Sequence, residues 1–210
     1  MDQHPLARVL EAMNATIQSH VGQLDALDEA IGDGDHGTNL AKAFAKLAAD
    51  RSRLAGLPLR EALAQAAATV TSEAGGAGGR FYGALGRGMA EAAPDGQVLP
   101  SDLVAMLEAG IAAVRSEGGA AKGGKTLLDV LIPVAQGMRS QLASDPAGLG
   151  ARVLAAAAHG LHGTTHLQAK HGLAADLGIA SVNRIDPGAC SCALLLGAAV
   201  GALETAPQAA

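Results

Sequence analysis

Apolar residues recur every three or four positions along most of this chain, the spacing that gathers them on one face of an α-helix. Alanine and leucine supply most of the apolar content, which favours helix over strand. A glycine-rich segment after residue 75 opens one more helix, so the pattern predicts about eight helices and no strands. The apolar stripes run from Leu6 to Val21, Leu40 to Leu47, Leu59 to Val70, Leu103 to Val114, Leu128 to Met138, Val153 to Ala157 and Cys190 to Leu203.

The connections between these helices differ in composition. Successive turns of an up-and-down bundle alternate between its two ends, so every second connection lies at the same end. The polar, glycine-rich connections fall into one set and the plainer ones into the other. We therefore predict an all-α, eight-helix antiparallel up-and-down barrel or bundle, one domain over residues 1–210 with a core over about 5–205, and a site in the loops at one end. The glycine-rich set is 28–39, 75–79, 118–126 and 183–188, and the plainer set is 55–59, 94–102 and 144–148.

Composition and charge exclude several classes of function. The net charge is −5 and no basic patch is present, which argues against nucleic-acid binding. The N-terminus lacks a signal peptide's features, and apolar stretches such as 193–203 fall short of the length of about 18 residues that a membrane span needs. Cys190 and Cys192 are too close for a typical disulfide and too few for a zinc site, so we interpret them as core residues. A soluble cytoplasmic protein is expected.

Three aspartates crowd into "LDEAIGDGDHGTN", residues 27–39. Two carboxylates about 4 Å apart repel by roughly 4 kcal/mol at an effective dielectric constant near 20, and a divalent cation reverses that sign. Oxygen-only ligands favour Mg²⁺, Ca²⁺ or Mn²⁺, so Asp28, Asp33 and Asp35 are candidate metal ligands. The alternative is a solvated acidic turn in which Asp28 or Asp33 caps the next helix. An EF-hand is excluded because its twelfth position would be Phe44.

The segment "GAAKGGKT", residues 119–126, matches the phosphate-binding pattern G-x-x-x-x-G-K-T. That pattern needs a preceding strand and a parallel sheet, whereas the residues before it have helical periodicity. A P-loop fold is therefore not expected. A glycine-rich loop that opens a helix still offers backbone N–H groups to anions, and the alternative is a helix C-cap followed by a turn.

Two further segments can be interpreted either as ligand-binding or as structural. Glycines in "EAGGAGGRFYG", residues 73–83, let the backbone approach a phosphate at a helix N-terminus, or let two helices pack closely. In "NRIDPGACS", residues 183–191, Asp186 is expected to N-cap the last helix with Pro187 at its first position. That structural role is compatible with main-chain contacts to a ligand.

The histidines divide into two groups. His36 lies inside the aspartate loop, where it could donate to a phosphate, orient a carboxylate or be a simple loop residue. The other four lie late in the seventh helix and just after it, without acidic or thiol neighbours in the sequence. We interpret these four as solvated or core-edge side chains instead of metal ligands; they are His159, His162, His166 and His171.

The motifs "LDEAIGDGDHGTN", "GGAGGRFYG", "GGKTLLD" and "DPGACS" occur in an order that resembles the L subunit of dihydroxyacetone kinases over nearly the whole chain. The resemblance implies an eight-helix antiparallel barrel with ADP or ATP at one end. It implies two Mg²⁺ ions that bridge the phosphates to Asp28, Asp33 and Asp35. The implied nucleotide contacts are His36, Gly37, Thr38, Asn39, Ala77, Gly78, Gly118, Leu127, Asp186, Pro187 and Gly188.

The resemblance also implies partners. A K-like subunit holds the ketone substrate, so this chain alone should have little kinase activity. In one branch of the family the nucleotide exchanges, and in the other ADP stays bound and an M-like subunit of the phosphotransferase system rephosphorylates it. The residues leave both branches open, and they also leave open a homodimer, a catalytically idle Mg-nucleotide-binding module with a regulatory role, and a helical carrier of apolar ligands.

The sequence departs from the family pattern in two of the loops. The family's Gly-Gly-Ala-Ser-Gly-Pro run has Gly78 in place of serine and Arg80 in place of proline. Leu173 stands where the family commonly has an arginine. The loss of two polar donors should weaken nucleotide binding unless Arg80 or Arg184 replaces them.

Overall fold

A computed structural model describes residues 4–118, 121–144 and 148–205, and all of its regular secondary structure is helical. Four short helical segments accompany the long helices: α3 (Arg51–Ala55), η1 (Thr164–His166), α9 (Gly172–Asp176) and η2 (Gly178–Ser181). The long helices are α1 (Pro5–Glu29), α2 (His36–Ala49), α4 (Leu59–Ala74), α5 (Gly76–Glu91), α6 (Pro100–Gly118), α7 (Leu128–Ser144), α8 (Leu149–Gly163) and α10 (Pro187–Glu204).

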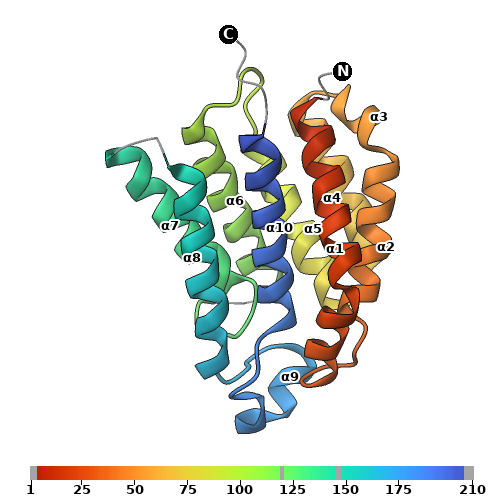
Figure 1. The fold of residues 1–210 in the computed structure, drawn as a ribbon, viewed down its shortest axis with the longest axis vertical. Coiled ribbons are helices and arrows are strands. Elements are labelled where there is room, and N and C mark those ends of the chain that lie inside the picture. Colours follow the sequence, from red (N-terminus) through yellow and green to blue (C-terminus); the bar gives the residue numbers. More distant parts are fainter. Residues whose placement is uncertain (1–3, 119–120, 145–147, 206–210) are drawn as a thin grey trace.

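The long helices run side by side along one axis (Figure 1), and their contacts close them into a ring. Each packs against the next long helix in the chain, and α10 packs against both α8 and α1, which closes the barrel. Short connections make neighbours antiparallel. The predicted up-and-down barrel of eight long helices is therefore confirmed for the part of the chain that the structure describes.

Aliphatic side chains fill the barrel, and glycines allow its helices to approach one another closely. Ile17, Leu24, Leu128 and Leu131 are essentially inaccessible to solvent. At the α5–α6 contact, a Cβ atom on Gly88 would lie 2.5 Å from the carbonyl oxygen of Ala109. With an aromatic content of 1%, the core depends on such close backbone packing as well as on large side chains.

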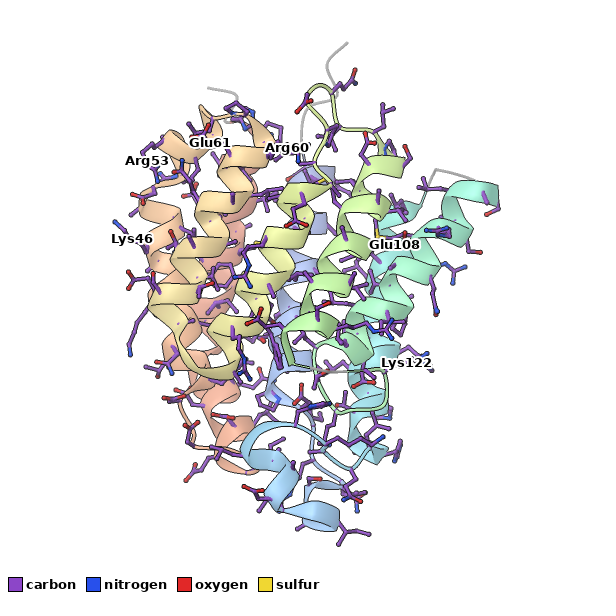
Figure 2. All side chains as sticks on the ribbon, turned by 180° about the vertical axis from the view of Figure 1, so that it is seen from behind. Lys46, Arg53, Arg60, Glu61, Glu108 and Lys122 are labelled. Carbon is purple, nitrogen blue, oxygen red and sulfur yellow. The ribbon has the colours of Figure 1, made fainter. Side chains whose placement is uncertain are left out.

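The two ends of the barrel differ, as the loop compositions predicted. Figure 1 places both chain termini at one end and α9 at the other. At the end with the termini, the Arg60 guanidinium donates to the backbone carbonyls of Ala90, Glu91 and Ala93, and so caps the C-terminus of α5. Arg53, Arg60 and Glu61 lie toward this end, whereas Lys122 lies toward the other (Figure 2).

Two boundaries differ from the sequence prediction. The predicted loop at 75–79 is a break at Gly75 alone, with φ of 57°, because α5 already begins at Gly76. The predicted loop at 28–39 ends early, since His36 begins α2. Residues 119–120 and 145–147 of two predicted loops lie outside the described residues.

The expectation that every apolar stretch falls short of a membrane span was wrong for α10. Over Pro187–Glu204, its 18 residues are long and apolar enough to cross a membrane by length and composition. In this structure α10 packs against α1, α7 and α8, and its first turns lie in the core. The two cysteines on α10 are free and buried, and burial raises the pKa of both thiols, which confirms that they are core residues.

Candidate functional site

The aspartate loop is folded around one carboxylate. Asp28, in the last turn of α1, accepts hydrogen bonds at Oδ2 from the backbone N–H groups of Gly34, Asp35 and His36, at 3.0, 3.0 and 3.2 Å. The bond from His36 satisfies the first N–H of α2, so Asp28 helps to cap that helix, as one part of the alternative to metal binding expects. Gly32 fits here because a Cβ atom would lie 2.3 Å from Asp28 Oδ1. All three N–H groups bind Oδ2, so Oδ1 of Asp28 accepts none of these hydrogen bonds.

The cap does not exclude metal binding, because the three carboxylates still converge. One oxygen from each of Asp28, Asp33 and Asp35 lies within 4.8 Å of the others. Across residues 4–118, 121–144 and 148–205, no lysine or arginine forms an ion pair with any of the three. An uncompensated set of oxygen donors suits a hard divalent cation, and these residues therefore fit Mg²⁺.

A cavity of about 590 Å³ opens beside the aspartates at the α9 end of the barrel. It is lined by the aspartate loop, the first turn of α5, the segment before α7, the segment around α9, and the start of α10. Five parts of the chain that lie far apart in sequence thus meet around one space. Of the residues predicted for metal or nucleotide, the lining includes Asp28, Asp33, Asp35, His36, Asn39, Ala77, Gly78, Gly118, Leu127, Asp186, Pro187 and Gly188.

Two of the predicted nucleotide contacts face α1 instead. A Cβ atom on Gly37 would lie 2.4 Å from the carbonyl oxygen of Val21, so this glycine allows α2 to pack closely on α1. Thr38 donates its backbone N–H and its hydroxyl to the Asp25 carboxylate, at 2.9 and 2.7 Å. Both residues join α1 to α2, the two helices that flank the aspartate loop.

The "GGKT" segment is tied to its own protein. The Asp129 carboxylate accepts from the backbone N–H groups of Gly123 and Thr126. Lys125, only 3% exposed and at a positive φ of 61°, donates from Nζ to the carbonyl oxygens of Thr164 and Arg184. These bonds join the loop before α7 to the segments before α9 and α10. Within the described part of the loop, the lysine thus has a structural role that the phosphate-binding pattern did not predict.

Asp186 caps α10, as predicted, from a buried position. Its Oδ2 accepts from the backbone N–H of Ala189 at 2.6 Å, and Pro187 occupies the first position of the helix. Burial raises the pKa of this carboxyl to about 7, against the opposing effects of the Ala189 N–H and Lys125. The folded protein therefore holds this proton more tightly than the unfolded chain does.

The raised pKa of Asp186 predicts a pH-dependent stability. Its contribution is fully present below pH 4 and is lost as the pH rises through 7, because only the folded state then has to bury a charge. Between pH 5 and 8, without metal or nucleotide, the wild type should lose about 2.5 kcal/mol of unfolding free energy relative to Asp186→Asn. Urea denaturation of both proteins at the two pH values measures this difference, and parallel pH profiles would contradict it.

Several residues around the cavity were missed or read differently from the sequence. Tyr82 and Thr126 line it, and His171 lies at its edge with Gly124 behind its ring. The signal for Tyr82 and Thr126 was their place inside the quoted motifs, whereas His171 lies in none of them. Among the four late histidines, His162 and His166 have rings 6.1 Å apart in an edge-on arrangement, and none belongs to a candidate metal cluster among the described residues.

The departures from the family pattern lie at the cavity as well. Gly78, Arg80 and Leu173 all line it, and the Arg80 guanidinium lies 5.3 Å from the centre of the Phe81 ring. Arg184 contributes a carbonyl oxygen to the bond with Lys125. Of the two arginines considered as replacement donors, Arg80 is therefore the one that the structure places beside the cavity.

The closed ring of helices and the acidic cavity at one end define an all-helical barrel with a composite loop site. The chain belongs to the DAK2 domain family, which matches residues 30–201. It is 33% identical over 191 residues to the ADP-binding subunit DhaL of a PEP-dependent dihydroxyacetone kinase from Listeria innocua, covering 91% of this chain and 92% of that one. The corresponding Escherichia coli subunit is 34% identical over 172 residues, covering 80% and 81%.

The fold is similar to that of a solved structure with bound nucleotide. The dihydroxyacetone kinase of C. freundii in complex with AMP-PNP and Mg²⁺ superposes with a TM-score of 0.71 at 25% identity. The match covers 93% of this chain and 33% of that one, so this chain spans about a third of the larger kinase. The resemblance drawn from the sequence motifs is thus confirmed at the level of family and fold.

Proposed function

We propose that this chain is the ADP- or ATP-binding L subunit of a dihydroxyacetone-type kinase, which transfers a phosphoryl group to dihydroxyacetone or a related ketose on a separate K-like subunit. The observation that carries the proposal is the convergence of three carboxylates, within 4.8 Å, at a cavity of about 590 Å³. Similarity to ADP-binding subunits and to a kinase complex with AMP-PNP and Mg²⁺ supports the same chemistry.

The aspartates would hold two Mg²⁺ ions together with the nucleotide's phosphates. Bound there, Mg²⁺ supplies positive charge that offsets the phosphoryl oxygens. The protein's own contribution is positional. Three hydrogen bonds from backbone N–H groups to Asp28 fix the loop, and Gly37 and Thr38 fix α2 against α1.

Backbone amides and small residues would hold the rest of the nucleotide. Ala77 and Gly78 lie in the first turn of α5 and line the cavity. The backbone N–H groups of a first turn have no partner within the helix, and they form the positive end of the helix dipole. His36 and Asn39 present side chains from the first turn of α2. Gly118, Leu127 and the 186–188 segment line the remaining wall.

A partner would bring the acceptor hydroxyl to the open side of the cavity. Near that opening, the α9–η2 segment exposes Leu173, Leu177 and Ile179, the last of them 81% accessible. Such a cluster of large exposed apolar side chains beside a polar site favours a protein contact. We propose that this apolar surface contacts the K-like subunit, and a homodimer contact is the alternative. Both would form in the cytoplasm.

Similarity to PEP-dependent relatives favours the branch in which ADP stays bound and an M-like subunit restores the phosphoryl group. Native mass spectrometry of the purified protein separates the branches. A mass increment of Mg-ADP that survives purification is expected for a resident cofactor. Ready loss of the nucleotide would favour exchange with ATP.

The proposed activity requires the partner. Phosphate transfer to dihydroxyacetone is expected when this chain, Mg²⁺, a phosphoryl donor and a K-like subunit are mixed, and only background transfer when the K-like subunit is omitted. Phosphorus NMR of the ketose phosphate measures the outcome. Absence of transfer in the complete mixture, despite tight Mg-ADP binding, would overturn the kinase assignment.

Tight Mg-ADP binding without phosphate transfer would favour a catalytically idle Mg-nucleotide-binding module that contacts a regulator. Gly78 and Leu173 motivate this candidate. Both residues line the cavity, and both stand where the family commonly has a polar side chain. The two candidates share the nucleotide site and differ only in transfer.

A further inference from the structure

Three polar side chains from three helices form a buried hydrogen-bonded group beside the cavity. The Tyr82 hydroxyl in α5 lies 2.7 Å from Ser191 Oγ in α10, and Ser191 Oγ lies 2.9 Å from His36 Nε2 at the start of α2. Ser191 is fully buried and Tyr82 nearly so. The Gly188 carbonyl oxygen is within 3.3 Å of the Tyr82 hydroxyl and 3.1 Å of Ser191 Oγ. This group joins the aspartate loop to the start of α10.

The other nitrogen of His36, Nδ1, lies beside Gly78, and both residues line the cavity. His36 lines that space, and among the described residues no hydrogen bond is made to its Nδ1. Gly78 lies directly beside this nitrogen, since a Cβ atom there would be 3.4 Å from Nδ1. The glycine therefore leaves Nδ1 uncovered, and one side of the ring is held by protein while the other is available to a ligand.

For a neutral imidazole ring, counting protons gives two arrangements of this group. In the first, Tyr82 donates to Ser191, Ser191 donates to Nε2, and the ring carries its proton on Nδ1. In the second, Nε2–H donates to Ser191, Ser191 donates to the Gly188 carbonyl, and Nδ1 presents a lone pair. The first offers a donor to the cavity, and the second turns a lone pair toward any phosphate oxygen that binds there.

We propose that Ser191, oriented by Tyr82, is a positioning residue that holds the His36 ring with its proton on Nδ1, so that Nδ1–H donates to a phosphate oxygen of the nucleotide. This inference rests on the proposed nucleotide site and extends it to a residue that touches no ligand. It gives "DPGACS" a second function besides capping, because its serine sets the hydrogen-bonding character of a histidine 155 residues away.

Binding measurements with ADP and Mg²⁺ test the proposal. Ser191→Ala should weaken Mg-ADP binding about tenfold, as expected for the loss of one oriented donor to a charged oxygen. Ser191→Thr, which keeps the hydroxyl, should restore affinity close to that of the wild type. Thermal unfolding of each variant without ligand shows whether the fold is retained, and Tyr82 keeps the Gly188 carbonyl as a partner in Ser191→Ala.

A double-mutant cycle separates positioning from general packing. In His36→Asn, the side-chain amide offers a donor from the branch of the side chain where Nδ1 stood, but it cannot reach Ser191. In that background, Ser191→Ala should leave Mg-ADP affinity unchanged. An equal, tenfold loss in both backgrounds would assign Ser191 a structural role only and overturn the proposal.

Nitrogen NMR of the histidine rings supplies a readout that does not depend on activity. In the complex with Mg-ADP, His36 should carry its proton on Nδ1, and Ser191→Ala should shift the population toward the Nε2–H form. A wild-type complex in the Nε2–H form would overturn the inference while leaving the nucleotide site intact. If the wild type does not bind Mg-ADP at all, the proposed function fails first and this inference fails with it.

Discussion

Asp33→Ala is expected to abolish Mg-dependent ADP binding while leaving the helical content of the protein unchanged. Asp33 is exposed, and within the described residues its carboxylate makes no hydrogen bond or ion pair. Its removal therefore costs the fold little, but it takes one of three carboxylates from the proposed metal ligands. Because even outer residues around a metal change affinity 10- to 100-fold, the loss of a ligand should exceed about 100-fold. Calorimetric titration of ADP with and without Mg²⁺ measures it, and far-UV circular dichroism monitors the fold.

The matched control is Asp95→Ala. Asp95 is an exposed acid at the opposite end of the barrel, where it pairs weakly with Arg60 at 3.8 Å. The Asp95→Ala substitution removes the same charge as Asp33→Ala but does not touch the cavity. The Mg-ADP affinity of this variant should equal that of the wild type. Unaltered affinity in Asp33→Ala, or an equal loss in Asp95→Ala, would remove the aspartate cluster from the nucleotide site.

The fold could be predicted from helical periodicity, because a helix that buries one face has apolar residues every three or four positions along its sequence. The same regularity placed the glycine-rich connections at one end. Short helices such as α3 and α9 leave no such trace, since one turn and a half cannot establish a period. Boundaries at Gly75 and His36 depended on backbone conformation, which a glycine-rich segment does not reveal.

Site residues could be predicted where chemistry is crowded in sequence and not where it is assembled in space. The three aspartates lie within eight positions of one another, and their mutual repulsion made them candidate metal ligands, which the structure brings together at the cavity. The bonds of Lys125 span 39 and 59 positions, and the bond between His36 and Ser191 spans 155. No pattern along the chain contains such distances, so these roles emerged only once the helices were packed.

Gly88→Ala is expected to destabilise the protein strongly, by about 3 kcal/mol or more. The added Cβ atom would lie 2.5 Å from the Ala109 carbonyl oxygen and 2.8 Å from Gly110 Cα, both backbone atoms of α6. Backbone cannot rotate away as a side chain can, so α5 and α6 would have to move apart along their contact. Urea denaturation followed by circular dichroism measures the change in unfolding free energy.

Gly22→Ala in α1 isolates the cause of that loss. Gly22 is also a mid-helix glycine, but a Cβ atom there would meet nothing within 4 Å. The gain from replacing glycine by alanine in a helix should then appear alone, as a stabilisation of about 0.5–1 kcal/mol. The two substitutions are chemically identical, so their opposite signs would attribute the effect to helix contact. Equal effects would instead show that α5 and α6 adjust freely, and that close backbone packing does not hold this barrel together.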